Sequence, residues 1–339
     1  MAELKLNPSI CAKCQTRDCI MKCQYIDLPL EKAKEEQEKM FRGEKSEILT
    51  QCVTCFGCEE YCPHNNHPFF FISEQQEKLG INPVPVPVTD AMVNVLTPAG
   101  DSMAIDCKKN VIDMCNFTML AGMLRGKIFK DVTTFGGTDN FCNLMYMHFA
   151  RSSVTMKRVP GVIDNIMTKY LKKNNITDLI CFHDECYGTY TKWAPLNGVE
   201  VPFKPVHFFE FIYNRLLELK DDIKPLNIKV AYQRSCSSRI TPETDHFVDD
   251  IFKLIGVERV DRVYDRKNAL CCGAAVEMHQ KFDLVEDIQD KNVDDMKANG
   301  AAYCVFSCPL CFFTLMGKVF KKGMMPILMS DLCLKALGE

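Results

Sequence analysis

The sequence lacks an excess of charge of either sign, because 41 lysine and arginine residues are balanced by 44 aspartate and glutamate residues in a chain of 339. This balance excludes the strongly basic surface of a nucleic-acid-binding protein. No run of 18 apolar residues occurs, since the nearest candidate, residues 305–317, is short and contains Pro309. We therefore expect no membrane-spanning helix. Residues 1–5 also lack an apolar signal-peptide core, which predicts a cytoplasmic protein that reaches a membrane only through partner subunits, if at all.

Nucleotide-binding fingerprints are also missing. The sequence Gly136-Gly137-Thr138 has no G-x-x-G continuation, and no Walker-type phosphate loop occurs. We expect no nucleotide or flavin in this chain. Any nucleotide or flavin would then have to be carried by a separate subunit.

Cysteine, in contrast, is abundant, with 20 residues. A reducing cytoplasm does not sustain a disulfide framework, so these thiols indicate metal ligation or redox chemistry. Eight cysteines lie in the first 62 residues, and five more form a pattern in the last 104. The remaining seven are expected to be small buried hydrophobic residues. They are Cys107, Cys115, Cys142, Cys181, Cys186, Cys304 and Cys333.

The first cysteine group has the spacing of a bacterial-type ferredoxin site. Residues 52–63 read C-x2-C-x2-C-x3-C-P, in which three closely spaced thiolates surround one face of an iron–sulfur cube and Pro63 turns the chain away. Gly57 is small enough to let the backbone curl around the cube. The fourth cysteine of such a run ligates a second cluster. A second run is present at residues 11–23 as C-x2-C-x4-C-x3-C, with a longer middle spacing and Gln24 in place of the proline.

Crosswise ligation between the two runs predicts two cubane [4Fe–4S] clusters. The ligands would be Cys11, Cys14, Cys19 and Cys62 for one cluster and Cys52, Cys55, Cys58 and Cys23 for the other. The alternative is a pair of structural zinc sites, which thiolates also form. Zinc does not explain two near-identical groups of four. Residues 30–49, which are rich in Glu and Lys, predict a solvated helix that connects the runs.

A proline-rich segment follows. Its three alternating prolines, at residues 83–87, favour an extended spacer. This predicts a dicluster domain at residues 1–82 and a linker at 83–90. Beyond it the pattern alternates between strands and helices, with strands expected at residues 178–182, 228–233, 257–263 and 301–306. Cysteines follow the carboxyl ends of the last three strands, which is where open α/β sheets place their binding sites.

The carboxyl-terminal cysteines follow the order C-x34-C-C-G-x34-C-x2-C. They are Cys236, Cys271, Cys272, Cys308 and Cys311. This pattern resembles the CCG domain of the heterodisulfide reductase B and D subunits and related iron–sulfur oxidoreductases. The ferredoxin-like cysteines in front of it are similar to the D-type fusion. The resemblance implies that the five cysteines hold a noncubane [4Fe–4S] cluster in an anaerobic redox complex.

The reductase family carries the CCG repeat twice, and a second copy is expected here at residues 91–225, before the intact copy at 226–339. A shift of 136 residues aligns Gly100 with Cys236 and aligns Phe135-Gly136 with the cysteine pair. A shift of 125 aligns His183 and Cys186 with Cys308 and Cys311. Cys186 is the only cysteine that remains at a ligand position of this copy. We therefore expect the first repeat to hold no cluster and to act as a scaffold or pocket wall.

His183 of this first repeat is expected to donate a hydrogen bond in the pocket. The less favoured alternative is a zinc site formed with Cys142, Cys181 and Cys186. The predicted fold combines α+β and α/β classes. A small helical, bacterial-ferredoxin-like domain is followed by two α/β CCG-type repeats.

The function implied by the resemblance is that of an oxidoreductase subunit. Electrons would pass through two cubane clusters to the noncubane cluster, which acts on a thiol or disulfide substrate. Two alternatives stay open: a non-catalytic relay between a flavoprotein and a quinone-linked or other redox partner, and a zinc-stabilised interaction module. Arg239 and His279 are candidates for anion binding or hydrogen bonds to sulfur near the cluster. Arg234 is expected to be a surface or capping side chain.

Overall fold

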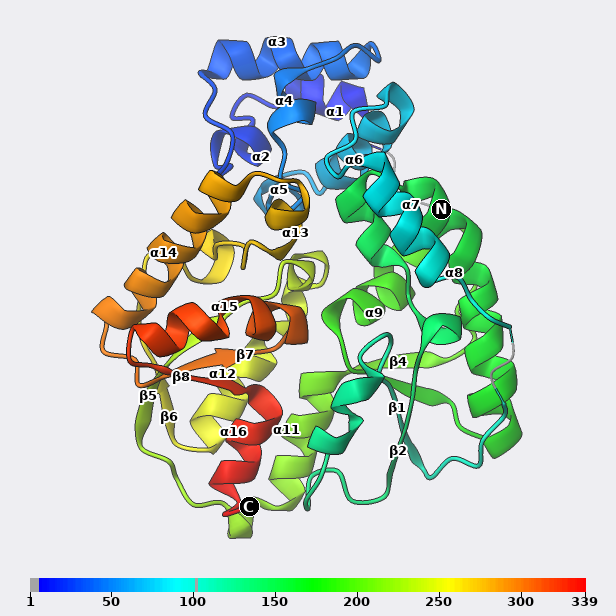
Figure 1. The fold of residues 1–339 in the computed structure, drawn as a ribbon, viewed down its shortest axis with the longest axis vertical. Coiled ribbons are helices and arrows are strands. Elements are labelled where there is room, and N and C mark those ends of the chain that lie inside the picture. Colours follow the sequence, from blue (N-terminus) through cyan, green and yellow to red (C-terminus); the bar gives the residue numbers. More distant parts are fainter. Residues whose placement is uncertain (1–5, 101–102) are drawn as a thin grey trace.

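A group of helices at the amino terminus lies above two parallel sheets in the computed structural model, which describes residues 6–100 and 103–339 (Figure 1). Residues 6–80 contain helices and loops and no strand. This agrees with the mostly helical region that the sequence predicts. The helices are α1 (Pro8–Lys13), α2 (Asp18–Met21), α3 (Leu30–Phe41), α4 (Glu47–Gln51), α5 (Gly57–Tyr61) and α6 (Pro68–Leu79).

The segment at 30–49 is not the single helix that we expected. Helix α3 ends at Phe41, and the chain turns at Gly43, whose φ of 72° lies in the left-handed region that glycine adopts without strain. Helix α4 then begins after Ser46, whose side chain accepts a hydrogen bond from the amide of Ile48. The turn and the new cap divide the connection into two helices.

The proline-rich segment also differs from the prediction, because most of it is helical. Helix α7 (Val86–Val95) begins directly after Pro85, with Pro87 in its first turn. Proline is tolerated there, since the amide that it lacks has no partner within the helix. The amides of Val88 and Thr89 donate to the carbonyl of Pro85. The expected extended spacer at 83–90 is therefore limited to its first residues.

Two four-stranded sheets, each with only parallel pairs, form the rest of the chain. Their orders are β2-β1-β3-β4 and β6-β5-β7-β8, so the second sheet repeats the topology of the first. The strands are β1 (Asn110–Asp113), β2 (Val132–Phe135), β3 (Asp178–Cys181), β4 (Lys204–His207), β5 (Ile228–Gln233), β6 (Val257–Arg259), β7 (Tyr303–Phe306) and β8 (Met325–Leu328). This is the architecture of two α/β repeats that the sequence predicts.

The strand predictions are confirmed in position and are too long in part. Strand β5 spans the predicted residues 228–233, whereas β6 ends at Arg259 instead of continuing to 263. The guanidinium of Arg262 donates to the carbonyl of Tyr232 at 2.7 Å, which takes the acceptor that the next backbone amide of β6 would have used. The edge strand therefore stops early.

Helices cover the sheets on both faces. The α-helices are α8 (Ser152–Ile166), α9 (Asp184–Gly188), α10 (Ala194–Leu196), α11 (Phe208–Glu218), α12 (His246–Leu254), α13 (Ala274–Met278), α14 (Phe282–Ala298), α15 (Pro309–Lys321) and α16 (Met329–Ala336). The π-helical segments are η4 (Met167–Leu171) and η6 (Thr189–Trp193). The 3-10 segments are η1 (Thr118–Met123), η2 (Thr138–Asn140), η3 (Leu144–Phe149), η5 (Lys172–Asn174), η7 (Lys220–Asp222), η8 (Ser237–Ile240), η9 (Pro242–Thr244) and η10 (Arg266–Asn268).

The two repeats share one hydrophobic core. Ile112 and Ile180 of the first sheet and Val230 and Val305 of the second belong to the same buried cluster, together with side chains of α11, α12 and α16. Figure 1 shows these three helices between the sheets. Because apolar burial is the dominant favourable term in folding, this shared core fixes the two sheets relative to each other. None of the helices in the described part of the chain combines the length and apolar character needed to cross a bilayer.

Candidate metal centre

The five carboxyl-terminal cysteines gather at the carboxyl edge of the second sheet. They come from the ends of three connections, with Cys236 after β5, the vicinal pair before α13, and the last two at the start of α15. All five line one cavity of about 460 Å³. Four are buried and Cys236 is partly exposed. The spacing pattern therefore corresponds to a real cluster of thiols.

Two backbone features hold these cysteines in place. Gly273 has a φ of 95°, and an added Cβ would lie 2.9 Å from Gln289 Nε2, so only glycine fits where the cysteine pair turns into α13. Cys308 is the N-cap of α15, and Pro309 occupies the first turn, where proline preorganises the helix. Cys311 follows on that turn. The local sequence thus sets the direction of each thiol.

Hydrogen bonding gives two of these thiols an acidic character. The neighbours Cys271 and Cys311 hold the pKa of Cys272 well below its usual range. A hydrogen bond from Cys311 and the adjacent His183 lower the pKa of Cys308 to about 6, against the effect of burial. Metals bind the thiolate form of cysteine. This donor set therefore suits an iron–sulfur centre.

Two histidines of the first repeat contact cysteines of the second. Nε2 of His183, the N-cap of α9, lies 3.3 Å from Sγ of Cys308, and Nε2 of His148, in η3, lies 3.9 Å from Sγ of Cys236. Burial opposes protonation of His183, but Cys308 and Glu185 raise its pKa to about 10, so Nε2–H donates to the sulfur. The expected hydrogen-bonding role of His183 agrees with this contact. His148 was missed, because no sequence spacing marks it.

Arg239 and Arg234 are buried at the junction with the amino-terminal helices. Both guanidinium groups bind the same oxygen of Glu60, at 3.0 Å and 2.6 Å, and Arg234 also pairs with Asp245. Arg239 donates in addition to the carbonyl of Ala269. The expectation that Arg234 is a surface or capping side chain is wrong, and Arg239 is not among the residues that line the 460 Å³ cavity.

His279 is also placed behind the cavity wall. Its Nε2 lies 3.1 Å from the carbonyl oxygen of His148, and burial lowers its pKa to about 4. The ring is therefore neutral at pH 7, with Nε2–H as the donor to that carbonyl. His279 touches the segment that carries His148 and does not itself line the cavity.

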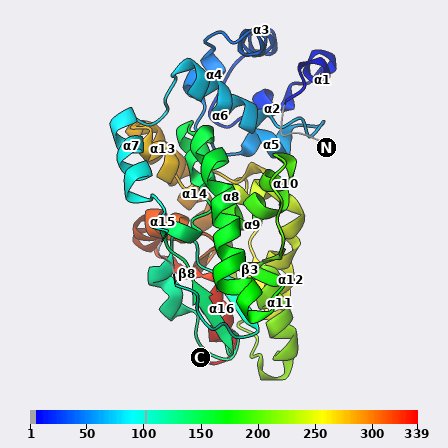
Figure 2. The same ribbon diagram turned by 90° about the vertical axis from the view of Figure 1, so that its right-hand side faces the viewer.

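The wall opposite the cysteines is apolar and comes from α7 and the first repeat. Figure 2 shows α7 below the amino-terminal helices, on the same side of the molecule as α13 and α15. The wall residues are Met92, Val95, Leu96, Phe117, Phe141, Met145 and Phe149. A volume of about 460 Å³ is within the range of small-molecule sites, roughly 300–1,000 Å³. Sequence reasoning missed the contribution of α7, because the proline-rich segment predicted an extended spacer.

The amino-terminal cysteines fall into two neighbourhoods. Burial raises the pKa values of Cys11 and Cys19, and Cys62 lies close enough to both to raise them further by thiolate repulsion. Burial and then the nearby Cys55 likewise raise the pKa of Cys23. The remaining neighbours are Cys14 in the first group and Cys52 and Cys58 in the second. The structure therefore brings together the residues that crosswise ligation requires.

The backbone around these cysteines forms a cradle with donors aimed at sulfur. The amides of Thr54 and Asn66 donate to Sγ of Cys52 and Cys62, each at 3.3 Å, and hydrogen bonds to sulfur tune iron–sulfur clusters. Thr54 and Phe56 have positive φ values of 54° and 59°, which curl the chain. A Cβ on Gly57 would lie 3.3 Å from Cys55 Sγ, so a small residue is needed there, as the sequence predicts. The cradle fits a cluster.

The amino-terminal thiols lie close to the carboxyl-terminal ones. The charge on Cys55 contributes to the raised pKa of Cys236, after burial and two nearer cysteines and Glu185. The amide of Cys271 donates to the hydroxyl of Tyr25 at 2.9 Å. Burial raises the pKa of the Tyr25 hydroxyl, and the charges on Cys55 and Cys271 raise it further, so Tyr25 lies close to both cysteines. The two cysteine sites are therefore connected by direct contacts.

The strand topology corrects the alignment predicted for the first repeat. Strand β2 ends at Phe135 and is the counterpart of β6, so Phe135 and Gly136 do not occupy the loop of the cysteine pair. Phe141-Cys142-Asn143 occupies it instead. Asn143 has a φ of 60° and precedes η3, just as Gly273 precedes α13. Cys142 therefore corresponds to Cys272.

The other ligand positions of the first repeat follow from the same comparison. Cys115 lies just after β1 as Cys236 lies just after β5, so it replaces Gly100 in the alignment. Cys186 lies in α9 as Cys311 lies in α15, as expected. The first repeat thus keeps three of the five cysteine positions, two more than the sequence indicated.

Comparisons with known proteins identify part of the chain. The family model described as the CCG cysteine-rich domain matches residues 230–316. No curated protein matches the sequence. The structure is similar to the crystal structure of a hypothetical protein from Helicobacter pylori, with a TM-score of 0.56 and 11% identity over 90% of this chain and 64% of that one. At this identity the similarity shows the fold alone, and this chain spans less than two thirds of that protein's length.

Proposed function

We propose that this chain is an iron–sulfur oxidoreductase subunit that resembles heterodisulfide reductase and acts on a thiol or disulfide. The ligands of a noncubane [4Fe–4S] cluster would be Cys236, Cys271, Cys272, Cys308 and Cys311. Two cubane clusters would be held crosswise by Cys11, Cys14, Cys19 and Cys62 and by Cys52, Cys55, Cys58 and Cys23. Bound clusters would supply one-electron transfer between the amino-terminal helices and the cavity.

The observation that carries this proposal is the cavity itself. It places five cysteines of a CCG domain against an apolar wall in a space of about 460 Å³. The cluster itself would fill the part of this cavity next to its ligands, and a pure relay site needs no apolar wall from α7 and the first repeat facing it. Small-molecule sites, in contrast, combine apolar walls with a few polar groups. The geometry therefore favours a small organic substrate over simple electron transfer.

The side chains around the cavity have distinct tasks in this proposal. His183 donates to Sγ of Cys308 and fixes the charge on that sulfur. Glu185 lies 3.8 Å from Nδ1 of His183 and keeps the ring protonated. Met92 of α7 and Leu96, the C-cap of that helix, exclude water from the cysteine side. Exclusion of water strengthens each of these electrostatic contacts.

Electrons would enter through the amino-terminal domain from separate redox subunits. The sequence has no nucleotide or flavin motif, so a flavoprotein, a hydrogenase or dehydrogenase, or a membrane electron carrier would supply or accept them. The contact between Cys271 and Tyr25 supports a route from the cubane ligands to the cavity. The alternative function, a relay to a quinone-linked or other partner, uses the same route.

The first test is the metal content after anaerobic purification. We expect about twelve irons and a similar amount of acid-labile sulfide, four irons for each of three clusters. Electron paramagnetic resonance of the reduced protein should resolve the cubane signals. Zinc in place of iron at the thirteen proposed ligands would contradict the proposal and support the zinc-stabilised module.

The second test separates catalysis from relay. Dithionite-reduced protein is mixed with a small dialkyl disulfide, and the release of thiols is measured. Each disulfide takes two electrons and two protons to yield two thiols. We expect turnover, with loss of activity in Cys236→Ser and little change in Cys333→Ser, whose thiol is buried in α16 away from the cavity. Unchanged spectra after addition of the disulfide would favour the relay.

A further inference from the structure

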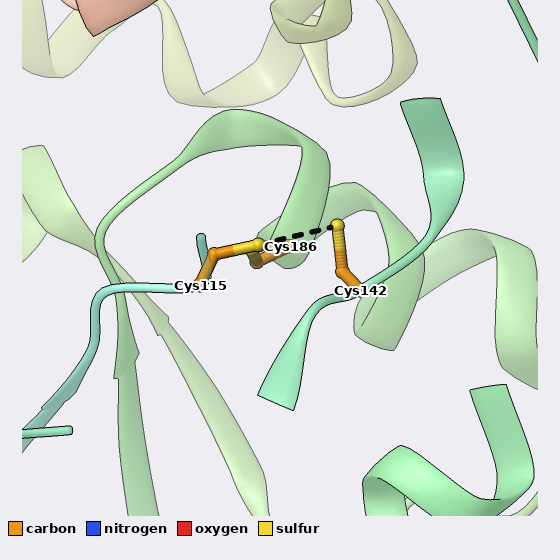
Figure 3. Close-up of side chains that lie close together, drawn as sticks. All are labelled: Cys115, Cys142 and Cys186. Carbon is orange, nitrogen blue, oxygen red and sulfur yellow. Dashed lines mark hydrogen bonds between the residues drawn. The ribbon is translucent and has the colours of Figure 1, made fainter. Parts of the chain in front are cut away.

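Three buried cysteines of the first repeat meet beside the cavity that the five cysteines of the second repeat line. Cys115, Cys142 and Cys186 are each at most 1% exposed. Their Sγ atoms all lie within 4.8 Å of one another, and those of Cys115 and Cys142 are 3.8 Å apart. Figure 3 shows the three thiols pointing toward one another from three different segments. The cluster is part of neither proposed iron–sulfur site.

The sulfur spacing matches a single tetrahedral ion. Zn–S bonds of about 2.3 Å at tetrahedral angles place two sulfur ligands about 3.8 Å apart. A disulfide would join only two of the three sulfur atoms and would leave the third buried thiol without a partner. A [4Fe–4S] cube uses four thiolates on four separate irons, whereas these sulfurs converge on one point.

The backbone supports this convergence. Cys115 has a φ of 52°, a conformation that residues with a Cβ adopt uncommonly. It is held by its amide, which donates to Asp113 Oδ1 at 2.8 Å, and by its carbonyl, which accepts from the amide of Gly137 at 2.7 Å. A Cβ on Gly136 would lie 2.5 Å from that same carbonyl oxygen. The loop is thus built around one orientation of Cys115.

We propose that Cys115, Cys142 and Cys186 bind one thiophilic divalent metal ion with the coordination chemistry of Zn²⁺. The ion would replace the thiol protons, which leave to solvent, and would join the loops after β1 and η2 to α9. Cys115 also lines the 460 Å³ cavity, which provides a path for entry of the ion and for a water molecule as the fourth ligand.

Such an ion would stabilise the cavity wall. Phe117 follows Cys115, Phe141 precedes Cys142, and His183 lies one turn before Cys186, and all three side chains line the cavity. A core of three cysteines without an ion would hold these segments only by packing. The proposal replaces the expectation of a metal-free first repeat, which rested on an alignment that placed Gly100 and Gly136 at ligand positions. It does not rest on the proposed redox function.

The test measures zinc, iron and sulfide in the full chain, purified anaerobically and exchanged into buffer with one added equivalent of Zn²⁺. We expect about one tightly bound zinc per chain. The single variants Cys115→Ser, Cys142→Ser and Cys186→Ser should each lose this zinc and keep the iron and sulfide of the wild-type chain. Cys333→Ser, a matched buried cysteine with no sulfur partner among the described residues, should keep both.

X-ray absorption at the zinc edge of the wild-type chain gives an answer that does not depend on whether the variants fold. We expect three sulfur neighbours at about 2.3 Å and one oxygen neighbour. Zinc-free wild-type protein, or zinc retained in all three variants, would overturn the proposal. Loss of iron together with sulfide from these variants would also overturn it, because the site would then hold a cluster. The zinc result does not depend on whether the thirteen other proposed ligands hold iron, so the two proposals can fail separately.

Discussion

The two repeats have the same sheet order but different side chains at equivalent positions. The N-cap of α15 is Cys308, and the N-cap of α9 is His183. These two positions face each other, with Nε2 of His183 3.3 Å from Sγ of Cys308. A duplicated fold thus places equivalent positions on opposite walls of one cavity. Once one wall supplies the ligand, the other is free to supply the hydrogen-bond donor.

The cysteines show the same divergence. The second repeat keeps five around the cavity, and the first keeps three that converge in the interior. The lost positions are occupied by His183 and by Phe141, where Cys308 and Cys271 stand in the other repeat. In the first repeat the three cysteines converge on one another, and of the three Cys115 alone lines the cavity, where Phe141 forms part of the apolar wall.

The largest expected effect separates equivalent cysteines of the two repeats. Cys272→Ser removes a proposed ligand of the noncubane cluster and should reduce the iron content from about twelve to about eight per chain. Cys142→Ser, at the corresponding position, should leave the iron content unchanged. Iron and sulfide analysis after anaerobic purification checks both. Equal iron loss from the two variants would show that the repeats carry equivalent clusters.

The second expected effect concerns the junction between the second repeat and the amino-terminal helices. Glu60→Gln leaves the buried guanidinium groups of Arg234 and Arg239 without their common carboxylate. Breaking a buried ion pair in this way costs about 3–5 kcal/mol of unfolding free energy. Urea unfolding of the iron-loaded chain measures it.

The control for this substitution is Glu258→Gln, because Glu258 pairs with Lys229 at the exposed end of the sheet. Exposed pairs contribute about 0–1 kcal/mol. If both variants unfold at similar urea concentrations, the arginine–glutamate junction does not hold the amino-terminal helices to the second repeat.

The third prediction tests the histidine that stands where the second repeat has a cysteine. His183→Gln replaces the cationic donor to Cys308 Sγ with a neutral one, and hydrogen bonds to charged groups are worth about 1.5–3 kcal/mol. The negative charge of the reduced site is then less stabilised, so the midpoint potential of the site should shift to more negative values by tens of millivolts. Spectroelectrochemical titration measures the shift.

His246→Gln is the matched control for the potential, because His246 lies on the exposed start of α12 and bonds only to the carbonyl of Glu243. A potential that moves equally in the two variants, or does not move in His183→Gln, would mean that the first repeat does not tune the cysteine site of the second.

Much of this comparison could be predicted from the sequence, and the rest fails for physical reasons. The five cysteines at fixed spacing and the apolar strand at residues 228–233 are local signals, and both are confirmed in position. Cys115 and Cys142 were missed as counterparts of Cys236 and Cys272 because 26 residues separate the first two, whereas 35 separate Cys236 from Cys272, so a fixed shift fails after a loop changes length.

Other predictions failed because they depend on where a residue lies within a helix or on contacts between distant segments. Pro87 predicts an extended chain unless it lies in the first turn of a helix, and only the structure shows that α7 begins there. The contact of His148 with Cys236 joins the two repeats across 88 positions of sequence, so no periodicity reports it. Arg234 was misjudged because its partner Glu60 lies in α5, 174 positions earlier in the sequence.

The smallest expected effect contrasts the two sheet-based repeats with the amino-terminal helices, which depend more on charge pairs. The carboxylate of Glu36 accepts from Lys39 and from the amide of Glu47, each at 2.7 Å. Burial opposes its ionisation, yet these hydrogen bonds and Lys32 lower its pKa to about 2. A depressed pKa contributes stability above the unfolded value near 4.5, which is lost as the pH falls toward 2.

Glu36→Gln should therefore weaken α3 at pH 7 and, because Glu36 is still ionised there, also at pH 4. We expect a loss of about 1 kcal/mol, or about fivefold faster amide exchange in α3, measured by brief hydrogen exchange with mass spectrometry. Glu31→Gln, whose partner Lys34 is an exposed pair, should change nothing. A difference between wild type and Glu36→Gln that is present at pH 7 and gone at pH 4 would mean that Glu36 titrates near its usual pKa, because a carboxylate without these donors is mostly protonated at the lower pH.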